Sequence, residues 1–391
     1  MIVYTGGFIM KILKSERSFS LTLIICLAAA ALLFSSSLAG AAYISQKITG
    51  YTAYDLENSS ELYSYLEYDL KLEQRLENGQ FVLNPKLQIN TLKEELELEL
   101  YEGYLDYYFT NADLRLGRQI ISWGKADGLA VTNLINDQSR VQRPFVNPDD
   151  RFLGSDGFKL DYYTDSGTLE AVLTLPPADS DLDADQSGFG LRYSVLGMGS
   201  DYEISAGSFP QYNPMLEVYN QLTGSSEALY RDQNFIGGSF SNDLGKFVLK
   251  GEGAYFFDRD YLQQTQQGPQ IVENNELEVL LGIDYYLGDY LIALQAKEGI
   301  LIDEPNNLMR DKSIGEYSLM VQRSFVRDNL NVENWLIYRE MPELPNMEDT
   351  LLWRSRLTYD YSDQLTFSTG VDHVIDGPDK SEIFAQIEYR F

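Results

Sequence analysis

From about residue 47 to residue 391, apolar and polar residues alternate with a period of two. One extended segment carries apolar side chains at every second position, namely Phe81, Leu83, Pro85, Leu87 and Ile89. Alternation of this kind is typical of β-strands with one apolar face, and no segment shows a helical period of useful length. Turn residues interrupt the pattern every 8–16 positions. The sequence therefore predicts an all-β protein of about 16–18 strands.

Two local features refine this strand pattern. Asn78 and Gly79 separate two alternating runs, and an Asn-Gly pair supplies the positive φ angles of a tight hairpin turn. Further along, glutamates occupy odd positions from 95 to 99, whereas Glu102 and Asp106 occupy even positions. One extra residue in a strand shifts the phase in this way. The sequence therefore predicts a β-bulge near Tyr101–Gly103.

The N-terminal region has the layout of a secretory signal. A basic region precedes an apolar run over Leu21–Phe34, and Ala39 and Ala41 form an A-x-A cleavage site. The apolar run has 14 residues, fewer than the roughly 20 that a membrane-spanning helix needs. We expect cleavage after Ala41, so that residues 1–41 are a signal peptide and residues 42–391 form the exported barrel.

The connections between the predicted strands alternate in length. Short periplasmic turns and long extracellular loops are typical of outer-membrane barrels, whereas a soluble sandwich has no reason to sort its connections in this way. In lipid every backbone N–H and C=O needs an internal partner, so a spanning sheet must close on itself. The sequence therefore predicts a transmembrane, antiparallel, up-and-down β-barrel of the bacterial outer membrane. The expected short connections are Tyr163–Gly167, Gly197–Ser200, Asn242–Gly245, Leu287–Asp289, Val326–Asn329 and Ser362–Gln364, and the expected long ones are Gly124–Ser155, Pro176–Ser187, Pro210–Asp232, Asp258–Glu276, Gly299–Ser313 and Glu340–Thr350.

The last alternating run ends on an aromatic residue. Phe391, Tyr389 and Ile387 share one face of this run. The pattern resembles the terminal-strand signal that the assembly machinery of Gram-negative outer membranes reads. The resemblance implies that this machinery is a partner, together with outer-membrane lipid and lipopolysaccharide. A monomer and a homo-oligomer both remain open.

The composition excludes several classes of protein. The chain of 391 residues has 30 Lys and Arg against 59 Asp and Glu, a formal net charge of −29. Nucleic-acid binding needs clustered basic residues that neutralise phosphates, so this class is excluded. Cys26 and His373 are the only residues of their types. A disulfide within the chain and a Cys/His zinc site are therefore excluded, and we expect no metal and no cofactor.

A barrel of this size is expected to enclose water. About 16–18 strands leave an aqueous lumen rather than a packed interior. The polar face of each strand then faces this lumen, where charged side chains select solutes. We expect the lining to include the charged residues Glu67, Asp69, Lys71, Glu97, Arg115, Arg192, Arg354 and Arg356.

The longest predicted loop, Gly124–Ser155, carries charges of both signs. Folded into the lumen, it would form a constriction whose electrostatic field selects solutes. The alternative is an ordinary exposed extracellular loop. The candidate constriction residues are Lys125, Arg140, Arg143, Asp149, Asp150 and Arg151.

One stretch suggests a family. Gly117, Arg118 and Gln119 end a strand, and Trp123 and Gly124 follow, giving the pattern G-R-Q-x-x-x-W-G. A long loop that contains Asn-Pro-Asp-Asp comes next. This stretch resembles a group of porin-like outer-membrane proteins, and alginate-export-type barrels carry a similar strand. The resemblance implies a transport or channel role without naming a solute, and the excess of acidic residues disfavours export of a polyanion.

Three further groups of side chains offer chemistry, each with a plainer interpretation. The four aspartates of Asp179–Asp185 would suit Ca²⁺, although a solvated loop is the better explanation. His373 is the only possible imidazole base, but alternation places it on an apolar, outward face. Glu95, Glu97 and Glu99 would form either an acidic catalytic cluster or a solvated inward ladder, and the strand pattern favours the ladder. We therefore predict no catalytic residue.

These features predict a porin-like channel for passive diffusion of small hydrophilic solutes or ions. Such a channel carries out no chemistry, and the excess of acidic residues favours cations or neutral solutes. One alternative is a plugged structural or adhesive barrel that presents extracellular loops such as 210–232. A second alternative is an outer-membrane hydrolase that depends on His373.

Overall fold

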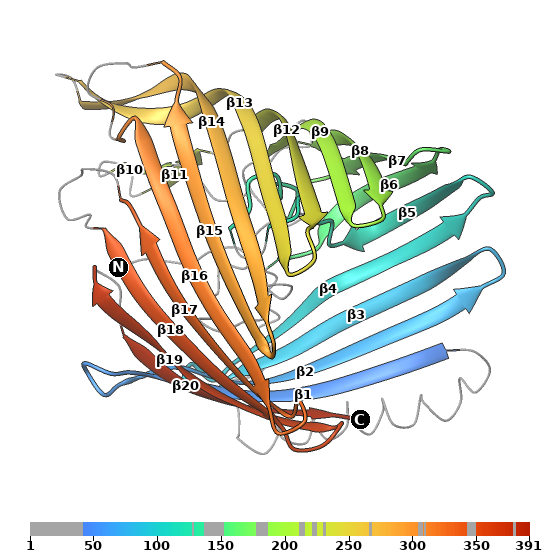
Figure 1. The fold of residues 1–391 in the computed structure, drawn as a ribbon, viewed down its shortest axis with the longest axis vertical. Coiled ribbons are helices and arrows are strands. Elements are labelled where there is room, and N and C mark those ends of the chain that lie inside the picture. The colour runs from blue at the N-terminus through green and yellow to red at the C-terminus, as the bar shows by residue number, and fades with distance from the viewer. Residues whose placement is uncertain are drawn as a thin grey trace.

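Within the residues that the structure describes, eighteen strands form one closed antiparallel sheet (Figure 1). The first strand, β1 (Ala42–Asp55), pairs with both β2 (Glu61–Leu76) and the last strand, β20 (Glu382–Arg390). Among the described residues, no helix is long and apolar enough to span a membrane. The computed structural model describes residues 42–126, 129–136, 152–176, 187–210, 216–220, 225–229, 232–265, 268–303, 308, 310–341, 349–377 and 381–391. The all-β barrel predicted from the sequence is confirmed, whereas the predicted signal peptide lies outside these ranges.

The other strands follow one another around the barrel in chain order, and β9 pairs with β12 across a separate hairpin formed by β10 and β11. Their bounds are β3 (Gly79–Asn90), β4 (Glu95–Tyr108), β5 (Ala112–Gln119), β6 (Ser155–Tyr163), β7 (Thr168–Thr174), β8 (Gly188–Gly197), β9 (Ser200–Pro210), β10 (Leu216–Asn220), β11 (Ser225–Leu229), β12 (Asp232–Asp243), β13 (Phe247–Thr265), β14 (Gly268–Leu287), β15 (Tyr290–Leu301), β16 (Ser313–Phe325), β17 (Leu330–Arg339), β18 (Thr350–Asp360) and β19 (Leu365–Asp376).

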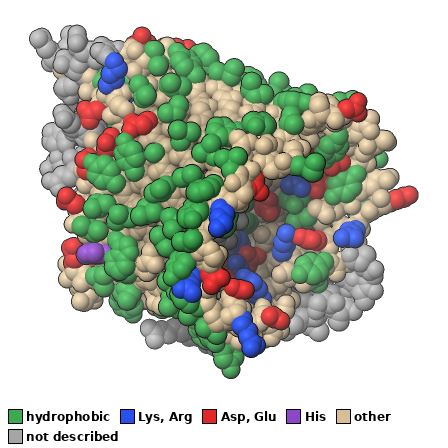
Figure 2. Space-filling view, in the orientation of Figure 1, with side chains coloured by type: hydrophobic (Ala, Val, Ile, Leu, Met, Phe, Trp, Pro, Cys, Tyr) green, Lys and Arg blue, Asp and Glu red, His purple; other side chains and the backbone are tan. Residues whose placement is uncertain are grey.

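Each barrel strand has an outward apolar face and an inward face that is mostly polar. The outward Leu281 and Leu294 are 62% and 50% exposed, whereas the inward Glu252 is 6% exposed. Apolar side chains cover the outside of the wall, and charges of both signs lie in its hollow (Figure 2). Backbone groups are paired around the closed sheet, so the exposed apolar band is suited to lipid.

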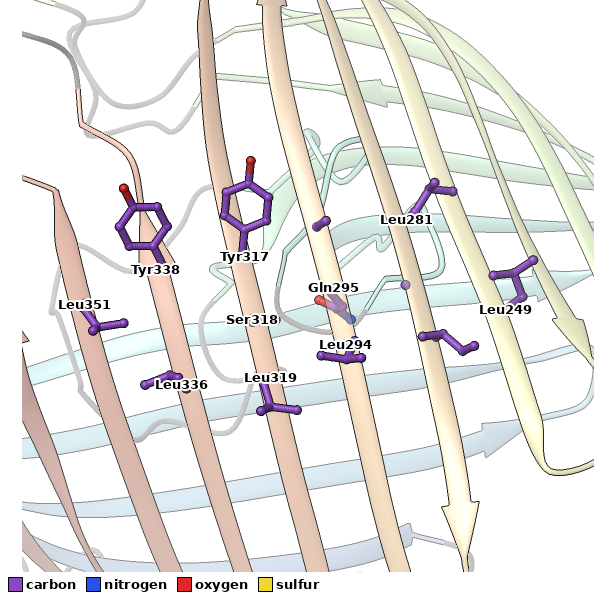
Figure 3. Close-up of a pocket in the computed structure, with 13 residues that line it drawn as sticks. Leu249, Leu281, Leu294, Gln295, Tyr317, Ser318, Leu319, Leu336, Tyr338 and Leu351 are labelled. Carbon is purple, nitrogen blue, oxygen red and sulfur yellow. The ribbon is translucent and has the colours of Figure 1, made fainter.

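A shallow groove crosses the outside of β13–β18 (Figure 3). Tyr317 and Tyr338 lie at its end nearer the long loops, and their rings stack with centroids 6.1 Å apart. Six leucines line it, namely Leu249, Leu281, Leu294, Leu319, Leu336 and Leu351. Because these side chains face away from the lumen, the groove belongs to the apolar outer band.

Short turns lie at one end of the barrel and the longest connections at the other, as predicted, except between β13 and β14. The turns at one end are short, and Gly245 and Gly288 within them adopt positive φ angles of 81° and 59°. Residues 120–154, between β5 and β6, form the longest connection at the other end. By the usual asymmetry of outer-membrane barrels, the short turns face the periplasm and the long loops face outward from the cell.

The prediction of a long loop over Asp258–Glu276 was wrong. β13 continues to Thr265 and β14 begins at Gly268, and the two strands pair along this whole length with one register shift after Phe256. This part of the hairpin is rich in Gln and Asn, which hides the alternation of apolar and polar residues. Backbone pairing above the lipid needs no apolar face, so polar strands continue there. The predicted loop Pro210–Asp232 likewise contains the β10–β11 hairpin.

The hairpin and the bulge predicted within β2–β4 are both present, but the turn of the hairpin differs from the prediction. Leu76 pairs with Gly79, so Glu77 and Asn78 form a tight two-residue turn. Neither Asn78 nor Gly79 adopts the predicted positive φ angle. The register between β3 and β4 shifts at Pro85, where Tyr101 is the extra residue of β4. Proline has no N–H to donate to the ladder, so a bulge opposite Pro85 leaves no donor unpaired.

Candidate functional site

Part of the connection between β5 and β6 lies inside the barrel. We call residues 120–126 and 129–136 the inner segment. Its apolar side chains pack against inward residues of the wall and are removed from water, which favours this position. The ring of Trp123 meets that of Phe209 edge-on, with centroids 5.8 Å apart. The buried cluster comprises Ile121, Trp123, Leu129, Val131 and Ile135 of the inner segment and Val172, Phe209, Phe235, Ala254, Phe256 and Leu280 of the wall.

Two inward carboxylates of the wall bind polar groups of the inner segment. Glu170 of β7 accepts a hydrogen bond from the indole N–H of Trp123 and pairs with Arg192 of β8 at 2.9 Å. Glu203 of β9 lies 3.0 Å from the Nζ of Lys125. Glu170 is 3% exposed, and a buried charge of this kind is tolerated only with such partners.

A third carboxylate, that of Glu252 in β13, holds the backbone of the inner segment at two places. Its Oε1 accepts the backbone N–H groups of Lys125 and Ala126, at 2.6 and 2.7 Å. Its Oε2 accepts those of Val131 and Thr132, at 2.9 and 3.1 Å. One side chain therefore joins both arms of the inner segment to a single point of the wall.

Further hydrogen bonds define the shape of the inner segment. The side-chain amide of Asn136 accepts the N–H of Ile121 at 3.2 Å and donates to its carbonyl at 2.7 Å, which joins the two ends. The Nζ of Lys297 in β15 donates to the carbonyl of Ala130 at 3.2 Å. The inner segment is thus held at its ends and near its tip.

One of the six predicted constriction residues lies in the described part of the chain. The structure places Lys125 between Glu203 and Asp201, whose carboxylate oxygens are 3.0 and 3.9 Å from its Nζ. Arg140, Arg143, Asp149, Asp150 and Arg151 lie outside the described residues. The role of these six residues in a constriction stays a prediction.

The predicted lumen-lining residues of β2 lie on its inward face. Asp69 is 3.8 Å from the Nζ of Lys86 in β3, and Lys71 pairs with Glu73 at 2.7 Å. Glu67 shares this face and is 5% exposed. The strand pattern therefore brings these charges together on one side of the sheet, although their contact with water stays a prediction.

Three of the predicted arginines, Arg115, Arg192 and Arg354, each bind a carboxylate of a neighbouring strand. Arg115 donates two hydrogen bonds to Asp106, at 2.6 and 2.9 Å, and Arg354 binds Asp372 in the same two-pronged way, at 2.8 and 2.7 Å. Arg192 pairs with Glu170, as described above. Opposite charges this close cancel much of the field that each would exert alone.

Glu97 and Arg356 complete the predicted lining. Glu97 is exposed on the inward face of β4, opposite Gln88, and Glu95 follows on the same face, opposite Asn90. Arg356 is opposite Glu333 of β17. The inward ladder predicted on β4 is therefore present as a row of carboxylates that begins next to the turn between β3 and β4.

The remaining candidates are His373 and the aspartates of the loop between β7 and β8. His373 lies on the outward face of β19, where alternation places it, and its Nδ1 is 3.1 Å from the Oγ of Ser381. The aspartates of Asp179–Asp185 lie outside the described residues. Among the residues that the structure describes, no group of three or more His, Cys, Asp or Glu is arranged to hold a metal ion.

Sequence reasoning misses the three carboxylates that bind the inner segment. Glu170, Glu203 and Glu252 look like ordinary inward residues of alternating strands. The two glycines beside Glu252 do not mark this contact, because a Cβ at Gly251 or Gly253 would meet Phe240 or Val279 of the wall rather than the inner segment.

The fold matches solved outer-membrane barrels of Pseudomonas aeruginosa. The chain is 11% identical to OccK5 (OpdH), with a TM-score of 0.58, and the match covers 90% of this chain and 98% of that chain. It is 12% identical to OccK2 (OpdF), solved in complex with glucuronate, with a TM-score of 0.57 and the same two coverages. For OccK8 (OprE) the identity is 11%, the TM-score 0.57, and the coverages are again 90% and 98%.

No family model and no curated protein matches the sequence. At such low identity the structural matches establish the fold rather than the solute. The chain therefore has the closed, 18-stranded fold of the outer-membrane porins of the OccK type.

Proposed function

We propose that this protein is a channel of the bacterial outer membrane through which small hydrophilic solutes or ions diffuse passively. The position of the inner segment carries this proposal. Its contacts through Trp123, Lys125 and Ala130 join it to the inner faces of β7, β9, β13 and β15, which lie on one side of the wall. A segment fixed to one side narrows a lumen without having to fill it.

Another part of the wall, β2 and β4, supports a preference for cations over anions. Glu95 and Glu97 are exposed on the inward face of β4, and Glu67 lies nearby on β2, across Gln88. A row of carboxylates along a narrow aqueous path raises the local concentration of cations. The glucuronate bound by OccK2 is an anion, and that preference is not carried over to a chain of 12% identity.

The test is single-channel recording of the purified barrel in a planar bilayer, with the reversal potential measured under a KCl gradient. Discrete openings whose reversal potential favours K⁺ over Cl⁻ would support the proposal. Openings with an anion preference would overturn the assigned selectivity. A folded barrel without conductance would overturn the channel and favour a plugged structural or adhesive barrel.

A further inference from the structure

We propose that Glu252 is a positioning residue that fixes the inner segment in the lumen. Its carboxylate is bound by four backbone N–H groups of that segment, which together we call the cradle. The consequence for conductance rests on the proposed channel function. The anchoring itself does not, because it concerns the position of the inner segment in the folded barrel.

The geometry of the cradle carries this inference. Lys125 and Ala126 turn two successive N–H groups toward one carboxylate oxygen, and Val131 and Thr132 turn two more toward the other, all within 3.1 Å. Successive backbone N–H groups that converge in this way form a concave anion site. Here the anion belongs to the wall of the same chain.

The backbone at the start of the cradle is shaped for this ligand. Gly124 has a φ of +94°, a conformation that favours glycine. A Cβ at this position would lie 2.4 Å from Oε1 of Glu252 and 2.7 Å from Oγ1 of Thr132. The carboxylate therefore packs directly against the turn whose N–H groups it accepts.

A carboxylate is the side chain that satisfies this cradle. Each of its two oxygens accepts two N–H groups, whereas an amide presents one oxygen and one NH₂ donor. In Glu252→Gln, one pair of N–H groups would face another donor. In Glu252→Ala, all four would lose their acceptor, and unpaired buried N–H groups favour release of the segment into water.

Anchoring by Glu252 has an electrostatic consequence for the lumen. The same turn that Glu252 holds carries Lys125, whose Nζ lies 3.0 Å from Glu203. If the turn is released, this ion pair opens, the lysine becomes free to face the lumen, and Glu203 keeps only Arg192, 3.4 Å away, as a cationic partner. Glu252 therefore controls the width and the charge of the constriction together.

The experiment measures tryptic cleavage after Lys125 in the folded barrel, followed by mass spectrometry of the new peptide end. It compares the wild-type protein with Glu252→Ala and Glu252→Gln. Glu333→Gln serves as the matched control, because Glu333 is also inward and accepts a hydrogen bond from Trp335 instead. Heat-modifiable migration on gels verifies that each barrel is closed.

We expect cleavage after Lys125 in Glu252→Ala to be about tenfold faster or more than in the wild-type protein. Cleavage in Glu252→Gln should be slightly slower than in Glu252→Ala but still faster than in the wild-type protein, and cleavage in Glu333→Gln should be unchanged. Acetate replaces the atoms that Glu252→Ala removes. At tens of millimolar it should restore protection, whereas chloride at equal ionic strength should not. In bilayers, the same variant should show noisier openings that acetate quiets.

Unchanged cleavage in Glu252→Ala would overturn the proposal, and so would acceleration that acetate and chloride reverse equally. If Glu252→Ala does not close into a barrel, Glu252→Gln decides: protection equal to the wild-type protein overturns the proposal, and faster cleavage supports it. A protein that shows the cleavage pattern without conductance would retain the anchor and lose only the channel function.

Discussion

The Nζ of Lys125 lies 3.0 Å from Oε1 of Glu203, so an ammonium group of the inner segment forms an ion pair with a carboxylate of the wall. We expect Lys125→Gln to leave Glu203 with Arg192, 3.4 Å away, as its remaining cationic partner. The loss of one positive charge should raise the permeability of K⁺ relative to Cl⁻ by about twofold. Reversal potentials under a KCl gradient measure this ratio. Lys246→Gln, in the short turn between β12 and β13, makes the same chemical change outside the lumen and should leave the ratio unchanged. A shift toward Cl⁻ would contradict the prediction.

Removing the exposed carboxylates of β4 should lower the permeability of K⁺ relative to Cl⁻. The double substitution Glu95→Gln and Glu97→Gln should lower the preference for K⁺ by about twofold, because two charges are lost from the inward face. Raising the salt concentration should shrink the difference between the variant and the wild-type protein, since ions screen exposed charges. Glu77→Gln, in the turn between β2 and β3, is the control for overall charge. An equal effect of Glu77→Gln would show that position within the lumen is irrelevant.

Substitutions at two glycines with similar φ angles distinguish backbone strain from a steric contact with Glu252. Gly124 and Gly245 have φ angles of +94° and +81°, so alanine costs about 1 kcal/mol at either position. Only at Gly124 does the added Cβ meet Glu252, whereas nothing lies within 4 Å of the Cβ at Gly245. We therefore expect Gly124→Ala to give noisy single-channel currents and Gly245→Ala to give quiet ones. Equal noise in the two variants would assign the effect to backbone strain.

The cluster inside the barrel is expected to contribute to stability. Phe256 of β13 is 0% exposed and packs against the inner segment from the wall. Phe256→Ala should lower the free energy of unfolding by about 3 kcal/mol or more, as in other cores. Urea titration in lipid vesicles measures this quantity. Noise in the single-channel current should rise as well, whereas Phe367→Ala, on the outward face of β19, should leave the current quiet.

The C-terminal aromatic face is expected to act during assembly. Tyr389 and Phe391 make an edge-on ring contact with centroids 4.9 Å apart, and the N–H of Phe391 donates to the carbonyl of Gln46. We expect Phe391→Ala to reduce the amount of folded barrel in outer membranes several-fold. Heat-modifiable migration on gels measures this amount. Refolding of the purified variant into vesicles at the wild-type rate would locate the defect in recognition by the assembly machinery, and slow refolding would contradict that role.

The barrel could be predicted from the sequence because lipid imposes a simple rule. Along β18, Leu351, Trp353 and Leu357 alternate with Arg354 and Arg356, and each outward position must be apolar for the strand to span. Where a strand extends beyond the lipid, its outward positions need not be apolar and the alternation is lost. The polar continuation of β13 and β14 reads as a loop, although backbone pairing extends it as a hairpin.

The site was less predictable, because its contacts join distant parts of the chain. The loop that supplies the inner segment was identified by its length, and Lys125 by its charge. Which wall residues receive it depends on the curvature of the sheet, which brings Glu170, Glu203 and Glu252 around one turn of backbone. Each of these glutamates is separated from the inner segment by dozens of residues, and an alternating pattern contains no such pairing.

The pairing of β1 with β20 determines when folding can finish. Lys47 pairs with Arg390, so the first strand of the barrel finds its second neighbour only when the last strand is in place. Contacts this distant in the chain form slowly, because a long loop must close first. Until then β1 and β19 each have an edge of unpaired backbone groups, which aggregates in water and is excluded from lipid. Closure is therefore a late, cooperative step, and the unpaired edges need protection until it occurs.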